Sequence, residues 1–164
     1  MLRNKSAFTQ LELTVVIAII AILAAITVGG LISWLPKYRL NSAATEMQAM
    51  IQTARLRAVK DNGRVVILFD PNADGDLDGD YMAFMDDEAG GAGEWTREPA
   101  SEPLVKTGQL PPGVSFENTT FANNRFRYSS RGFLLGINGS INLKNSRNGT
   151  KRITVYVSGN SRVF

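Results

Sequence analysis

The sequence of 164 residues contains no cysteine and no histidine. Without cysteine there can be no disulfide bond and no thiolate nucleophile, and without either residue there is no Cys/His zinc site and no imidazole general base. A phosphate-binding glycine loop and a Gly-x-Ser-x-Gly nucleophile elbow are also missing. We therefore expect a protein that is not an enzyme and that requires no cofactor.

Charge of one sign is scarce in two long stretches of the chain. Residues 118–164 contain eight basic residues and no acid, whereas the stretch from Asp70 to Glu102 contains eleven acids and a single base, Arg97. The net charge of +3 therefore hides a strong asymmetry along the sequence. With 44% apolar residues, the chain is long enough to bury one hydrophobic core.

The N-terminal region contains a run of twenty residues, Leu13–Ile32, without any charge. As a helix this run would span roughly 30 Å, the thickness of the hydrocarbon core of a membrane. Arg3 and Lys5 precede the run and would stay on the cytoplasmic side, while Trp34 and Tyr38 follow it and suit a headgroup interface. The run is long for a cleaved secretory signal, so a membrane anchor is the simpler interpretation.

Neither a signal peptide nor a plain anchor explains Glu12, which lies at the start of the apolar run. A carboxylate at the apolar end of a helix is costly unless it finds a partner. One available partner is a free α-amino group on a neighbouring copy, which would exist if the chain were cut just before Phe8. The position of Glu12 therefore points to processing and to self-assembly.

The stretch "SAFTQLELTVVIAIIAILAAI" resembles the class III signal of type IV pilins and type II secretion pseudopilins. The resemblance implies that a prepilin peptidase cuts between Ala7 and Phe8 and methylates the new N-terminus, although the family usually has glycine where Ala7 stands. It also implies an assembly role for Phe8 and Glu12, the fifth residue of the mature chain, whose carboxylate would neutralise the amine of an adjacent Phe8.

A long helix is predicted from Thr9 to Lys60. After the apolar run, small and apolar residues recur at steps of three and four and form one stripe: Leu40, Ala44, Met47, Ile51, Ala54 and Ala58. Gly29-Gly30 favours either close packing of small residues or a flexible segment, and Pro36 should bend the helix. The stop signal is Asp61-Asn62-Gly63.

The rest of the chain reads as short strands separated by Asn-Gly, Pro-Gly and Arg-Gly turns. We expect an α+β fold, in which the long helix packs on an antiparallel sheet or sandwich. Residues 89–108, rich in Gly, Pro and Glu, are predicted to form a long loop. The expected strands are Arg64–Asp70, Tyr81–Met85, Val114–Glu117, Arg125–Tyr128, Phe133–Leu135, Ser140–Leu143, Ile153–Val157 and Arg162–Phe164.

The C-terminal stretches "SSRGFLLGINGSINL" and "KRITVYVSGNSRV" resemble the end of the GspH/FimT group of minor pilins. The resemblance implies a leader at residues 1–7, a transmembrane and filament-core helix at 8–35, an amphipathic helix at 36–62 and a β-rich head at 63–164. It further implies a single pass through the bacterial inner membrane with a periplasmic head, and later a pilus or pseudopilus. The implied partners are other subunits, the prepilin peptidase and membrane lipids. An anchored β-domain that forms no filament is the alternative.

The acidic stretch "DPNADGDLDGD" has the opening spacing of a calcium-binding loop. Asp74, Asp76, Asp78 and Asp80 would supply the oxygen ligands for Ca²⁺. Met85 stands where such a loop has its bidentate carboxylate, so a solvated acidic turn is the competing interpretation.

The basic C-terminal stretch could bind the phosphates of nucleic acid. The candidate residues are Arg147, Lys151, Arg152 and Arg162. Some FimT-type minor pilins are DNA receptors with a Gly-Arg-x-Arg pattern in the last hairpin, but here the matching residues, Gly159 to Arg162, lack the first arginine. The competing interpretation is contact with an acidic face, either of a neighbouring subunit or of the chain's own segment from Asp70 to Glu102.

Overall fold

The structure, a computed structural model, describes residues 9–69, 80–86, 95, 97 and 102–164, without the side chains of residues 26–32. A single helix, α1, runs from Gln10 to Lys60 and continues through Gly29-Gly30 and Pro36. The chain divides into two compact units at this proline, Met1–Leu35 and Pro36–Phe164. The helix bounds match the prediction, while the bend at Pro36 stays a prediction.

The first unit contains the N-terminal half of α1. Its described apolar side chains are exposed, among them Leu11, Ile17 and Ile22. Within the residues that the structure describes, no helix is both long enough and apolar enough to cross a membrane.

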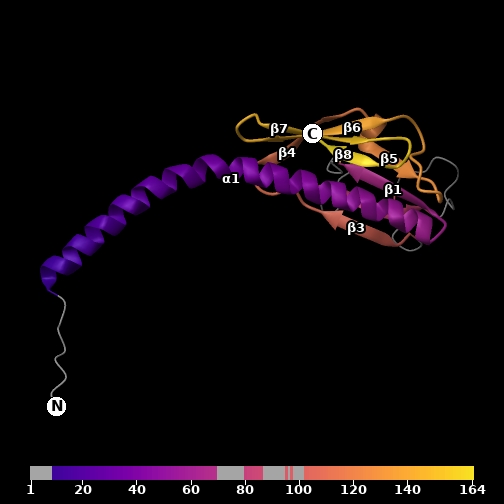
Figure 1. Ribbon diagram of the computed structural model, residues 1–164. Helices are drawn as coiled ribbons and strands as arrows, with labels where there is room; N and C mark the ends of the chain where they lie inside the picture. Colours follow the sequence, from indigo (N-terminus) through magenta and orange to yellow (C-terminus); the bar gives the residue numbers. More distant parts are fainter. Residues whose placement is uncertain (1–8, 70–79, 87–94, 96, 98–101) are drawn as a thin grey trace, which may run out of the picture. The chain divides into compact units, whose positions relative to one another are not determined.

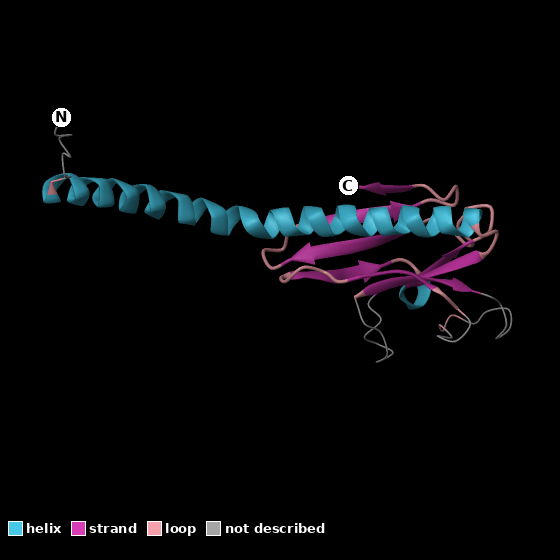
Figure 2. Cartoon of the chain, turned by 90° about the horizontal axis from the view of Figure 1, so that it is seen from below, coloured by secondary structure: helices cyan, strands magenta, loops and turns pink. Residues whose placement is uncertain are grey.

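The second unit contains the rest of α1 and, in its described part, two antiparallel four-stranded sheets (Figures 1 and 2). The first sheet has the strand order β3-β2-β1-β5 and the second has the order β4-β6-β7-β8. A short 3-10 helix, η2 (Ala122–Asn124), precedes β5. The strands are β1 (Arg64–Phe69), β2 (Tyr81–Asp86), β3 (Leu104–Gly108), β4 (Val114–Thr119), β5 (Arg125–Tyr128), β6 (Gly139–Asn145), β7 (Thr150–Val155) and β8 (Ser161–Val163).

The core lies between the second half of α1 and the inner faces of both sheets. The predicted helix stripe is buried throughout, and Met47, Ile51 and Ala58 have no exposed surface. Successive side chains of a strand point to opposite faces of its sheet, so one face of each sheet can pack against the helix. Each sheet sends every second side chain into this core: Val65, Ile67, Phe69, Tyr81, Ala83, Phe126 and Tyr128 from the first sheet and Ile141, Leu143, Ile153 and Val155 from the second.

The outer face of the first sheet is also apolar, because β1 and β2 are buried on both sides. Val66, Leu68, Met82 and Phe84 form a second small cluster, against which Trp95 packs. The Trp95 ring also lies under two guanidinium groups of β5, with Arg125 Cζ at 4.9 Å and Arg127 Cζ at 4.7 Å from the ring centre. Trp95 therefore covers this sheet face through both apolar and cation–π contacts.

Two strand predictions and one loop prediction need correction. Residues Phe133–Leu135 form no strand, and only Leu134 makes an isolated bridge, to Tyr128. The flanking Gly132 and Gly136 both have positive φ, which interrupts the extended backbone on either side. Conversely, β3 lies inside the predicted loop 89–108, and β7 begins three residues earlier than predicted.

The two buried core tyrosines make the stability of the head sensitive to alkaline pH. Burial, together with the nearby carboxylates of Glu46 and Asp80, raises the pKa of Tyr81 to about 12. Burial also raises the pKa of Tyr128, against the opposing charge of Arg55. The folded state therefore keeps phenolic protons that the unfolded chain loses near pH 10, so the free energy of unfolding should fall as pH rises from about 10 toward 12.

Urea unfolding at a series of pH values measures this effect. Tyr81→Phe should show a shallower loss of stability than the unchanged chain above pH 10, and the comparison cancels the lysines that titrate in the same range. An identical slope for the two proteins would contradict the assignment.

Candidate functional site

The start of α1 is held by reciprocal hydrogen bonds between Thr9 and Glu12. The backbone N–H and the hydroxyl of Thr9 both donate to Glu12 Oε2, each at 2.9 Å, and the Glu12 N–H donates to Thr9 Oγ1 at 3.3 Å. This is a capping box, which satisfies backbone donors that have no partner within the helix. The negative charge of Glu12 also lies at the positive end of the helix dipole.

The capping box changes how Glu12 is understood. The carboxylate already has hydrogen-bond partners within its own chain, so it does not depend on a neighbouring amine to be satisfied. The signal for this contact was present in the sequence as Thr9-x-x-Glu12, the spacing of a capping box. Of the other residues predicted to act in cleavage and assembly, Ala7 and Phe8 lie outside the described residues.

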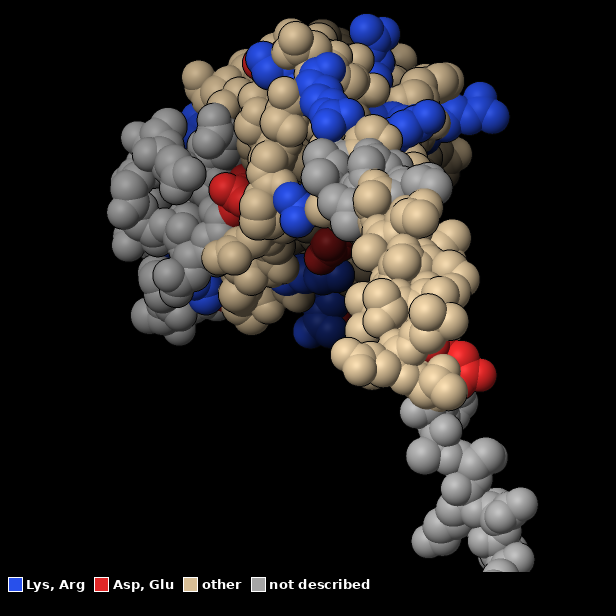
Figure 3. Space-filling model, turned by 90° about the vertical axis from the view of Figure 1, so that its left-hand side faces the viewer, with Lys and Arg blue, Asp and Glu red and all other residues tan. Residues whose placement is uncertain are grey.

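Basic side chains gather on one side of the head. Figure 3 shows Lys and Arg side chains at the top of the view, the side on which Figure 1 places β6 and β7. The four cations predicted to contact nucleic acid do not share one surface, however. Arg152 and Arg162 lie on the outer face of the second sheet, Lys151 is paired with the buried Leu143 on the opposite face, and Arg147 lies in the β6–β7 turn. Nucleic-acid binding stays a prediction.

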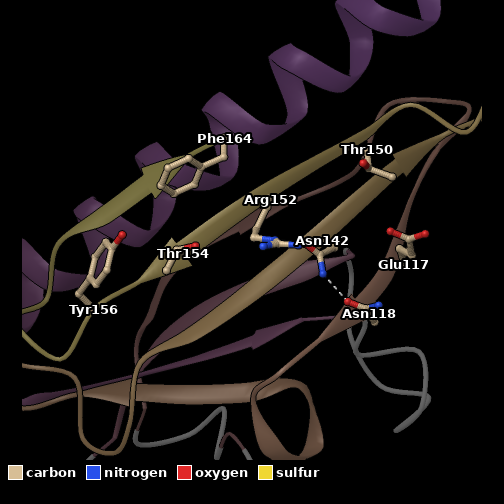
Figure 4. Close-up of a pocket in the computed structure, with 8 residues that line it drawn as sticks. All are labelled: Glu117, Asn118, Asn142, Thr150, Arg152, Thr154, Tyr156 and Phe164. Atoms are coloured by element: carbon tan, nitrogen blue, oxygen red, sulfur yellow. Dashed lines mark hydrogen bonds between the residues drawn. The ribbon is translucent and has the colours of Figure 1, made fainter.

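A polar groove of about 680 Å³ occupies the outer face of the second sheet (Figure 4). Across its floor, Arg152 Nε donates to Asn142 Oδ1 at 3.2 Å, and the Asn142 amide donates to Asn118 Oδ1. These bonds fix the orientation of the floor residues. The groove is lined by Glu117, Asn118, Asn142, Thr150, Arg152, Thr154, Tyr156 and Phe164.

The last hairpin is attached to α1 through Arg55. Its guanidinium donates to the carbonyl of Gly132 at 3.0 Å, to Asn160 Oδ1 at 2.8 Å and to the carbonyl of Ser158 at 3.1 Å. The Tyr128 hydroxyl donates to the carbonyl of Gly159 at 3.2 Å. One helix side chain thereby positions both the loop before β6 and the turn before β8, so the groove strands are held against the helix.

Of the four residues predicted to bind calcium, the structure describes Asp80. Asp80 Oδ2 accepts a hydrogen bond from the Leu110 N–H at 2.6 Å, so this carboxylate joins the start of β2 to the segment after β3. Asp74, Asp76 and Asp78 lie outside the described residues. Among the residues that are described, no group of three acidic side chains is placed to hold a metal ion. Calcium binding stays a prediction.

The fold defines the class of the protein. A long N-terminal helix whose second half packs on an antiparallel β head is the pilin fold. The family model described as Type II transport protein GspH matches residues 43–160. The chain therefore belongs to the GspH family of type IV minor pilins and pseudopilins.

Solved structures agree with this assignment at the level of the fold. Two crystal structures of the type IV minor pilin FimU from Pseudomonas aeruginosa are similar to this chain. The first has 16% identity and a TM-score of 0.52 and covers 78% of this chain and 90% of its own. The second has 18% identity and a TM-score of 0.51, with coverage of 76% and 92%. No curated protein matches the sequence. The family and the fold are those of structural subunits.

The attachment of the last hairpin can be tested with two glycines of positive φ. A Cβ at Gly159 (φ +84°) would overlap the carbonyl oxygen of Gly132 and approach Arg55 Nε to 2.6 Å, whereas a Cβ at Gly136 (φ +135°) would meet nothing within 4 Å. Gly159→Ala should therefore destabilise the head clearly more than Gly136→Ala, because only the first adds a steric clash to the backbone strain. Thermal unfolding of both variants measures the difference, and equal losses would contradict the packing described here.

Proposed function

We propose that the chain is a minor pilin or pseudopilin that is cut between Ala7 and Phe8, methylated at the new N-terminus and assembled into a filament. The family match and the pilin fold support the proposal at the level of class. The observation that carries the finer proposal is Glu12. It is the single charged residue between Ser6 and Pro36, and it lies at the first turn of α1.

In this proposal, the segment from Phe8 to Leu35 first anchors the subunit in the bacterial inner membrane and later lies in the filament core. The twenty uncharged residues Leu13–Ile32 match the thickness of a membrane. Arg3 and Lys5 would hold the leader on the cytoplasmic side, where the prepilin peptidase acts, and would place the head in the periplasm.

Glu12 has two successive partners in this mechanism. In the single subunit its carboxylate caps α1 through Thr9, which keeps the charge hydrogen-bonded and fixes it at the helix start. When a subunit joins the filament, the methylated amine of an adjacent Phe8 supplies a full positive charge, and an ion pair in an apolar core is far stronger than one in water. Charge pairing would then set the axial position of each new subunit.

The head would make the contacts with neighbouring subunits. The matched family model is that of a type II transport protein, and the similar crystal structures are of a type IV minor pilin. A type II secretion system and a type IV pilus therefore both fit the proposal. As a minor subunit, the chain would lie at the tip of the filament, in the complex that initiates assembly. The four candidate DNA contacts lie on different surfaces, so no observation favours DNA uptake over subunit contact.

Two substitutions separate the capping role of Glu12 from its charge. Glu12→Gln keeps a side chain that can cap the helix at this position, but it removes the charge. Thr9→Val removes the capping hydroxyl and keeps the charge. If charge pairing drives assembly, Glu12→Gln should be processed normally and lost from sheared filaments, with recovery reduced at least tenfold. Thr9→Val should still be incorporated.

Immunoblots of membrane and sheared-filament fractions provide the measurement, with the unchanged chain as the reference. Normal incorporation of Glu12→Gln would contradict charge pairing. Loss of Thr9→Val together with normal incorporation of Glu12→Gln would instead assign the role of Glu12 to the helix cap. Absence of even the unchanged chain from every filament fraction would favour a membrane-anchored head that forms no filament.

A further inference from the structure

The polar groove on the outer face of the second sheet is not explained by assembly through Glu12. We propose that this groove binds an oligosaccharide chain through side chains of β4, β6 and β7 and through Tyr156 and Phe164, which directly follow β7 and β8. The inference goes beyond the proposed function and does not depend on processing or on filament formation.

The first observation is a bulge in β4. The register between β4 and β6 skips Glu117, since Phe116 pairs with Leu143 and Asn118 pairs with Asn142. In a regular strand, two consecutive side chains would point to opposite faces. Because of the bulge, Glu117 and Asn118 both line the groove (Figure 4). Bulges commonly redirect a side chain toward a functional site.

The second observation is a row of side chains that crosses β4, β6 and β7 and ends at Phe164, the residue after β8. Asn118 is paired with Asn142, Asn142 with Arg152, and Arg152 with Phe164 through two backbone hydrogen bonds of 3.2 and 2.8 Å. Three interstrand spacings make this row roughly 14 Å long, which gives an extended site rather than a pocket for a single small group. Thr150 and Thr154 flank the row on β7.

The third observation is the contrast with the other sheet. The outer face of the first sheet carries Val66, Leu68, Met82 and Phe84, and Trp95 covers it. On the second sheet, the corresponding face carries hydroxyl, amide and charged groups with two aromatic rings, Tyr156 and Phe164, and 56% of Phe164 is exposed. A polar outer face is usual for a sheet that faces water, but the hydrogen bonds among Arg152, Asn142 and Asn118 also fix these side chains in place.

The chemistry of the lining favours a sugar chain. Sugar hydroxyls both donate and accept hydrogen bonds, and amides, hydroxyls, a guanidinium and a carboxylate together offer both kinds of group. The C–H faces of sugar rings are apolar and pack on exposed aromatic rings such as Phe164. Glu117 and Arg152 add one acceptor and one donor of higher strength.

The same lining disfavours a nucleic acid in the groove. A phosphate backbone is bound by several cations, and here the lining has one, Arg152, opposed by the carboxylate of Glu117. Arg162 lies on the same sheet face, but its guanidinium is placed over the Phe164 ring, 5.8 Å from the ring centre. The net charge of the groove lining is therefore close to neutral, which suits an uncharged ligand.

The test uses the full chain in a detergent without a sugar headgroup, so that the micelle does not compete for the groove. The probe is the β-1,4-linked tetramer of N-acetylglucosamine, and binding is followed by isothermal titration and saturation-transfer NMR. Saturable binding is expected, and Asn142→Ala and Phe164→Ala should each weaken it roughly tenfold or more. Asn142 lies in β6 and Phe164 follows β8, so if one variant fails to fold, the other still tests the proposal.

Matched controls lie elsewhere on the head. Asn41→Ala removes an exposed asparagine of α1, and Phe133→Ala removes an aromatic ring that is 50% exposed. Both should bind the tetramer like the unchanged chain. No saturable binding, or equal losses in groove and control variants, would overturn the proposal. Tight binding of single-stranded DNA that Arg152→Ala abolishes, together with no binding of the tetramer, would assign the groove to a polyanion instead.

Discussion

The burial of one helix stripe is the constraint on which the head depends. Ala44, Met47, Ile51, Ala54 and Ala58 have no exposed surface, and the inner faces of both sheets pack against them. Within each sheet, the strands form hydrogen bonds with strands of the same sheet. Helix α1 packs against both sheets and joins them in one core. The small residues in the stripe allow the strands to approach closely, while Met47 and Ile51 fill the space between the sheets.

Polar contacts along the same helix also hold the last hairpin in position. Arg55 bonds the loop before β6 and the turn before β8, and Gln48 and Gln52 both donate to Ser161 of β8 at 3.0 and 2.8 Å. The last hairpin is thus fixed by side chains of α1 as well as by its backbone ladder. This fixation matters for the groove, because Phe164 and Tyr156 border it from that hairpin and from the end of β7.

Much of the fold could be predicted from the sequence because its signals are periodic. The stripe of α1, the stop at Asn62-Gly63 and most strands follow from spacing and from turn residues. The strand β3 was missed because Leu104–Gly108 follows a Gly-, Pro- and Glu-rich stretch, although Val105 and Thr107 are β-branched. Residues Phe133–Leu135 were wrongly predicted as a strand because an apolar run says nothing about the positive φ of the glycines beside it.

The candidate sites were harder to predict for a different reason. Glu12 stood out in the sequence because a charge in an apolar run is conspicuous, and its cap by Thr9 was visible as a spacing. The groove depends on cross-strand register and on the skipped residue Glu117, and neither can be read from local pattern. The register of β7 also places the basic residues on two faces. Lys151 and Arg152 are consecutive in β7, so their side chains lie on opposite faces of the sheet.

The central claim is that the chain is a processed subunit whose mature form begins at Phe8. The most direct measurement is the mass of the full chain extracted from membranes of cells with and without a prepilin peptidase. The account predicts a chain that begins with methylated Phe8 in the first case and retains the leader, residues 1–7, in the second. A chain that keeps this leader in cells with an active peptidase, or one that is cut elsewhere, would contradict it.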